Sequence, residues 1–145
     1  MNTLNISFDS INAVKKDIPK TNVNVTSNIG IDDVTNANIG VDKTNTTMKI
    51  AFTFATKYSE NYAEIILKGN MIVLEESKLA KTILDNWKKN KKLDKDFATI
   101  VLNNLMAKSS MESVLIAKEL GLPSPIQLPR VRAVQPKPNA KKAKK

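Results

Sequence analysis

The sequence has no cysteine and no histidine, and it contains only four glycines. The missing thiols and imidazoles exclude disulfides, thiolate nucleophiles, Cys/His zinc sites and Ser-His catalytic pairs. The four glycines are too scattered to form a phosphate-binding loop or a dinucleotide fingerprint. We therefore predict that the chain is not an enzyme, with no catalytic residue, no metal, no cofactor and no small-molecule substrate.

Long apolar runs are also missing. No stretch approaches the roughly 20 apolar residues that span a bilayer, and the first residues have neither the basic nor the apolar part of a secretory signal. We therefore expect a cytoplasmic protein without membrane contact.

Adjacent acids occur only as Asp32–Asp33 and Glu75–Glu76. Because partners for catalysis or metal binding are lacking, we interpret these pairs as a turn and a helix start.

Positive charge is abundant at one end of the chain. The net charge is +9, yet 16 Lys and Arg face 14 Asp and Glu once the last sixteen residues are set aside. Those sixteen residues have two prolines, few apolar groups and no acid, so they are not expected to fold by themselves. We predict one domain over residues 1–129 and an extended basic tail over 130–145. The basic residues of the tail are Arg130, Arg132, Lys137, Lys141, Lys142, Lys144 and Lys145.

The basic residues suggest contact with a polyanion. Cations placed on nucleic-acid phosphates release condensed counterions, so we interpret the tail as RNA-binding in preference to a merely solubilising terminus. A second basic cluster consists of Lys88, Lys89, Lys91 and Lys92. This cluster either binds a phosphate backbone or is a solvated helix end that complements the helix dipole. Trp87 lies beside the cluster and can stack on a base, although its spacing from Ile83 and Leu79 favours a core position.

Apolar and polar residues alternate through the first half of the chain, which predicts strands, and the second half has a helical period. This segregation predicts an α+β fold. Turn residues at 58–62 make the last two strands a hairpin, and Gly69–Asn70 suits a bulge or bend. The predicted strands contain Leu4 to Phe8, Val23 to Ile31, Met48 to Tyr58 and Ala63 to Leu67.

Three helices are predicted in the second half. The first begins at Glu75 and uses Leu79, Ile83 and Trp87 as its apolar stripe. The second begins after an N-cap at Asp94, with Phe97, Ile100, Val101 and Leu105 in one stripe. Capping-box spacing over 109–112 restarts a third helix, which Gly121 ends before an extended arm rich in proline.

Over about residues 3–132 this layout resembles the SecB family of export chaperones, in particular divergent archaeal SecB-like proteins. The residues that carry the resemblance are the opening strand at 5–11, the hairpin from 49–54 to 64–69, and the helix exit at 120–129. The resemblance implies a four-stranded antiparallel sheet with helices packed on one face. It also implies tetramers that hold unfolded chains in apolar grooves.

Charge decides between two predicted functions. SecB chaperones are acidic, whereas this chain is basic, and its aromatic content is only 5%. We therefore predict a structural ribosomal or ribosome-associated protein whose tail contacts rRNA beside neighbouring ribosomal proteins. The alternative prediction is a SecB-type molecular chaperone whose partners are unfolded polypeptides.

Overall fold

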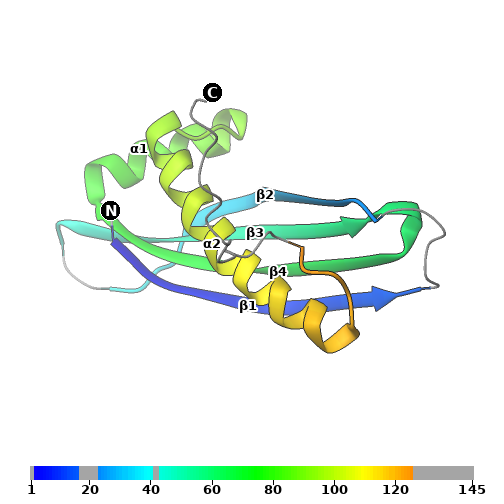
Figure 1. Ribbon diagram of the computed structural model, residues 1–145. Helices are drawn as coiled ribbons and strands as arrows, with labels where there is room; N and C mark the ends of the chain where they lie inside the picture. Colours follow the sequence, from blue (N-terminus) through cyan, green and yellow to red (C-terminus); the bar gives the residue numbers. More distant parts are fainter. Residues whose placement is uncertain (1, 17–22, 41–42, 126–145) are drawn as a thin grey trace, which may run out of the picture.

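The computed structural model describes residues 2–16, 23–40 and 43–125 (Figure 1). A single antiparallel sheet has the strand order β1-β4-β3-β2, and two helices follow it in the chain. This confirms the predicted α+β fold with a four-stranded antiparallel sheet and helices on one face. The elements are β1 (Asn2–Lys15), β2 (Val25–Asn36), β3 (Asn45–Tyr58), η1 (Ser59–Asn61), β4 (Ala63–Glu76), α1 (Ser77–Asn90) and α2 (Lys95–Leu120).

The hairpin of β3 and β4 forms the middle of the sheet. Its register runs from Asn45 opposite Glu76 to Lys57 opposite Glu64, and the short helix η1 closes the predicted turn. Every second residue of β3 is buried because its side chain points toward the helices. The face that carries these residues is called the helix-covered face below. Its buried β3 side chains include Met48, Ile50, Phe52 and Phe54.

The core has two parts because α2 crosses the sheet diagonally (Figure 1). In the first part, Ala80, Ile83 and Trp87 of α1 pack with the beginning of α2. In the second part, Ala117 and Leu122 pack on Phe54 and Tyr58. The predicted apolar stripes are only partly correct, since Leu79 and Ile100 are about half exposed. Leu4 is also exposed, because β1 has a register shift between Thr3 and Asn5.

Gly69 lies inside β4, which continues to Glu76 without interruption. The irregularity belongs to the partner strand, where the register shifts between Phe8 and Ser10. A Cβ at Gly69 would lie 2.0 Å from the carbonyl oxygen of Ser7, so the two backbones approach too closely for any side chain. The predicted bulge therefore exists, but it lies on β1 rather than at Gly69–Asn70.

The helix boundaries correct two predictions. Glu75 and Glu76 end β4, and α1 begins only at Ser77. The break predicted at 109–112 is wrong, because α2 runs as one helix from Lys95 to Leu120. Its inner line of buried residues recurs every fourth position and continues through Ser109, so packing holds the helix together there. The predicted ends are confirmed at Asp94, which accepts from the Phe97 N–H, and at Gly121, which has a φ of 67°.

Candidate functional site

The outward face of α2 carries apolar residues that are about half exposed or more. Met111 is 68% exposed, Leu115 is 59% exposed and Ile100 is 48% exposed. Together with exposed Ala107 they lie along one side of the helix, because 100, 107, 111 and 115 are spaced by seven and four residues. We call these four residues the outer stripe. A helix that is apolar on opposite sides is normally buried on both, so the outer stripe has the character of a contact surface.

Further exposed apolar residues surround α2. Ile11 of β1 is paired with buried Leu67, so its side chain points to the helix-covered face, yet it is 54% exposed. Leu79 is exposed on α1. Exposed apolar side chains thus occur in both layers of the domain, on β1 of the sheet and on α1 and α2.

Small residues set the distance between α2 and the sheet. Ser109, Ser113 and Ala117 are buried on the inner line of the helix. The Ser113 hydroxyl donates to the Ser110 carbonyl at 2.8 Å, whereas the buried Ser109 hydroxyl has no hydrogen-bond partner among the described residues. These short side chains follow the larger inner residues Phe97, Val101 and Leu105, and they allow the second half of the helix to lie close to the strands.

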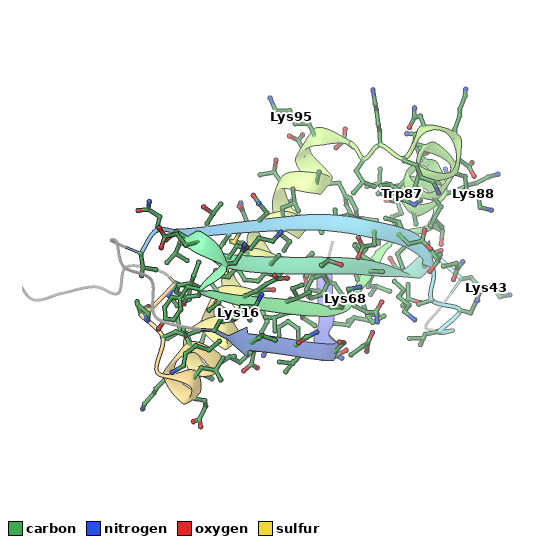
Figure 2. The ribbon with its side chains drawn as sticks, turned by 90° about the vertical axis from the view of Figure 1, so that its right-hand side faces the viewer. Lys16, Lys43, Lys68, Trp87, Lys88 and Lys95 are labelled. Atoms are coloured by element: carbon green, nitrogen blue, oxygen red, sulfur yellow. The ribbon has the colours of Figure 1, made fainter. Side chains whose placement is uncertain are left out.

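The predicted basic cluster at the end of α1 lies entirely on the surface. Lys88 and Lys89 belong to the last turn of α1, and Lys91 ends the helix in a left-handed conformation. Figure 2 shows Lys88 extending outward from α1 and Lys95 extending outward from the start of α2. All members of the predicted cluster are exposed. We call Lys88, Lys89, Lys91 and Lys92 the lysine corner.

Trp87 is a core residue, as its spacing predicted. It is only 7% exposed, and its indole N–H donates to Asp33 Oδ1 at 3.0 Å. The Nζ atom of Lys91 lies 5.5 Å from the centroid of the indole ring, within the range of a cation-π contact. The ring is therefore occupied by α1, β2 and Lys91, and it does not form a platform for stacking a base.

The acid pairs have structural roles. Asp33 accepts from both the Trp87 indole and the Val34 N–H, and Asp32 accepts from the Thr53 hydroxyl. Asp32 and Asp33 lie within β2, beside a register shift between Ile31 and Asp33. Their position in a strand corrects the predicted turn. Among the described residues no group of three acids could hold a metal ion.

A shallow hollow of about 240 Å³ lies at the end of the sheet next to η1. Its lining includes Lys16, Lys57, Asn61 and Glu64, whose charges are mixed and do not suggest a reaction. Tyr58 also borders it, but the Tyr58 hydroxyl donates to the Pro123 carbonyl at 2.6 Å. Burial raises the pKa of this hydroxyl, and the charge of Tyr62 raises the pKa further. Tyr58 thus fastens the segment after α2 to the sheet.

The tail residues lie outside the described part of the chain. Their predicted contact with RNA and their relation to the lysine corner stay predictions, as does the division at residue 129. Within the described ranges no helix is both long and apolar enough to cross a bilayer.

The sequence matches no model of a known protein family and no curated protein. A solved structure with the same fold is the Mycobacterium tuberculosis Rv1957 SecB-like chaperone in complex with a ChAD peptide from the Rv1956 HigA1 antitoxin. The two chains are 12% identical, the match covers 92% of each, and the TM-score is 0.53. This similarity confirms the SecB-like layout as a fold. The archaeal character of the resemblance and the basic tail stay predictions.

The comparison also corrects the predicted function. The identification as a ribosomal protein is corrected, because the fold matches that of a SecB-like chaperone and no comparison points to a ribosomal or rRNA-binding protein. Excess charge near one end of a chain describes an electrostatic preference and carries no information on fold.

Proposed function

We propose that this chain is a non-enzymatic, polypeptide-binding chaperone of the SecB type. The observation that carries the proposal is the outer stripe of α2, which leaves Met111, Leu115 and Ile100 in solvent on a SecB-like fold. Contiguous exposed apolar groups on a folded domain mark surfaces that bind other molecules. Unfolded polypeptides are the partners that offer apolar side chains without a fixed surface shape. The expected cytoplasmic location stays a prediction.

The shape of the surface supports extended ligands. The outer stripe spans residues 100–115, and a rise of 1.5 Å per residue gives it a length of about 22 Å. An extended peptide of about seven residues has the same length at roughly 3.3 Å per residue. The flexible thioether of Met111 can adapt to side chains of different shape, as a chaperone surface requires.

A pair of variants tests the proposal. The purified full chain should suppress aggregation of a chemically unfolded substrate protein, as measured by light scattering. Met111→Glu with Leu115→Glu should raise the chaperone concentration needed for half suppression about tenfold, because charged groups do not accept apolar contacts without a large desolvation cost. Both positions are exposed, so the fold should be kept. As the matched control, Thr99→Glu with Asn103→Glu adds the same charge at exposed polar positions of α2 and should change little.

The molecular mass of the same samples in solution is measured by analytical ultracentrifugation, because the SecB resemblance implies assembly of several copies. A double variant that keeps its mass but loses suppression supports polypeptide binding at the outer stripe. A variant that changes mass and keeps full suppression contradicts this assignment and identifies the stripe as a subunit contact. A wild-type chain with no effect on aggregation contradicts the proposed function itself.

A further inference from the structure

The lysine corner is a concentrated charge that the described fold neutralises only in part. The nearest acids in the sequence are Asp85, one turn before Lys88 and Lys89, and Asp94 and Asp96 at the start of α2, where the Asp94 carboxylate accepts from the Phe97 N–H as the cap. No member of the corner forms an ion pair with another described residue. The dipole of α1 accounts for a cation or two in its last turn. Lys92 lies beyond the helix, so the corner carries more charge than the dipole explains.

An exposed apolar side chain lies on the same helix as the lysines. Leu79 projects from the first turns of α1 and is 47% exposed. Leu79, Thr82, Asn86 and Lys89 follow one another at spacings of three and four, so they share one outward side of the helix. The rise along the axis puts Leu79 and Lys89 about 15 Å apart. An extended chain covers that distance with about four or five residues.

The chemistry of the corner fits an acidic polypeptide better than a nucleic acid. None of the large apolar residues exposed in the described part of the chain is aromatic, and the ring of Trp87 is buried. A base therefore finds no stacking surface here. The cations are lysines, whose single ammonium groups on flexible stems attract charge without the planar fork that arginine offers to phosphates and bases. Carboxylates on a mobile chain can meet such cations in many arrangements.

We propose that α1 selects acidic segments: the polypeptides that this chain prefers carry an apolar residue followed, four or five residues away, by Asp and Glu. The apolar residue contacts Leu79, and the acids approach the lysine corner. The inference rests on the proposed chaperone function and deepens it, because it names the class of substrate. It assigns to α1 a role in choosing the substrate, while the outer stripe of α2 supplies apolar contact of any sequence.

Peptide binding to the full chain measures this preference. Three fluorescent peptides share an apolar block of Leu and Phe and a spacer of four Gly and Ser residues, and they end in four Glu, four Gln or four Lys. Fluorescence anisotropy at 50 mM NaCl should give a Kd for the Glu peptide about fivefold to tenfold below that of the Gln peptide. The Lys peptide should bind more weakly than the Gln peptide. Raising NaCl to 300 mM should remove most of the difference.

Removing the lysines tests whether α1 is responsible. In a variant with Lys88→Gln, Lys89→Gln and Lys92→Gln, the advantage of the Glu peptide should fall to about twofold or less. Lys91 is left in place because it ends α1 with a φ of 57° and covers the Trp87 ring. Circular dichroism and the melting temperature should match those of the wild type, since the three replaced side chains are exposed.

The matched control removes the same charge from the other face of the sheet. Lys49, Lys57 and Lys68 are exposed on strands β3 and β4, on the face without helices. Figure 2 shows Lys68 on the sheet and Lys88 on α1, so the two sets belong to different layers. Replacing these three lysines by Gln should leave the advantage of the Glu peptide unchanged. Both variants keep the tail, so a difference between them reports on α1 alone.

The possible results separate the two proposals. If the Glu and Gln peptides bind equally well, or if the control variant loses as much preference as the α1 variant, the inference is overturned and the chaperone function stands. If none of the peptides binds, the proposed function fails as well. A twelve-residue oligouridine that displaces the Glu peptide at lower concentration than unlabelled Glu peptide, and loses this ability in the α1 variant, also overturns the inference. In that case the lysine corner is a nucleic-acid surface.

Discussion

Asp33, Trp87 and Lys91 show how side chains from two distant parts of the chain fix one helix to the sheet. One carboxylate oxygen of Asp33 accepts from the Val34 N–H and from the Trp87 indole. The indole ring in turn lies under the Lys91 ammonium. Asp33 therefore orients Trp87, and Trp87 orients the end of α1. At the residue scale, the position of the lysine corner depends on a buried ring and on a carboxylate that the sequence places 54 residues earlier.

Gly69 gives the prediction at this scale. Gly69→Ala should lower the free energy of unfolding by about 3 kcal/mol, because the new methyl group meets the backbone of Ser7 and Phe8 and the strands must separate. Gly30→Ala is the control, since a Cβ at Gly30 meets no atom within 4 Å. It should change stability by no more than about 0.5 kcal/mol. Urea unfolding followed by the fluorescence of Trp87, the one tryptophan of the chain, measures both variants.

At the scale of elements, α2 has two different apolar sides. Its inner line is built partly from small residues and lies on the sheet, whereas its outer stripe has large residues and lies in solvent. A helix that served only the core of its own domain would be polar on the outward side. The second apolar side is therefore the feature of α2 that points beyond the stability of the domain.

Ser109 tests whether α2 is one helix. In the described fold its hydroxyl is buried without a partner, so Ser109→Ala should be neutral or raise the free energy of unfolding by about 1 kcal/mol. If Ser109 instead capped a separate helix, the same change should cost about 1 kcal/mol. Ser109→Leu is the complementary variant and should cost about 1–3 kcal/mol, because the extra volume separates α2 from the sheet. Thermal unfolding distinguishes these outcomes.

At the scale of the whole molecule, charge and apolar surface are distributed independently. The buried residues of both core parts lie between residues 34 and 122, with partly buried residues of β1 and β2 packed against them, whereas seven positive charges follow residue 129. The helix-free face of the sheet has lysines next to acids, as at Lys57 opposite Glu64. We therefore expect the stability of the described fold to be largely independent of the large net charge.

Deleting residues 130–145 tests this separation. The net charge falls from +9 to +2, yet the unfolding midpoint should stay within about 2 °C, because the core of the described part of the chain ends at Leu122. Suppression of aggregation should also persist, since the proposed apolar surface lies on α2. A truncated chain that folds normally but no longer protects its substrate would show that the tail makes an essential contact. The measurements are thermal unfolding by circular dichroism and the light-scattering assay.

Local pattern alone predicted much of the fold. Alternation placed the strands, Asp94 and Gly121 marked the ends of α2, and the spacing of Trp87 placed it in the core. These features depend on a few neighbouring residues, so the sequence expresses them directly. Among the predicted site residues, the lysine corner is evident from the sequence as a cluster, but charge alone leaves both a phosphate contact and a solvated helix end open.

The amino-acid sequence by itself therefore determined the α+β class, the hairpin, the alternation of the core strands and the excess of positive charge. Only the tertiary structure decided that α2 is continuous through Ser109, that the bulge lies opposite Gly69, and that Ile100 and Leu79 face solvent. The physical reason is that these outcomes depend on contacts between segments far apart in the chain. A periodic pattern shows that a residue is apolar, but which apolar side is covered is settled when the helices pack on the sheet.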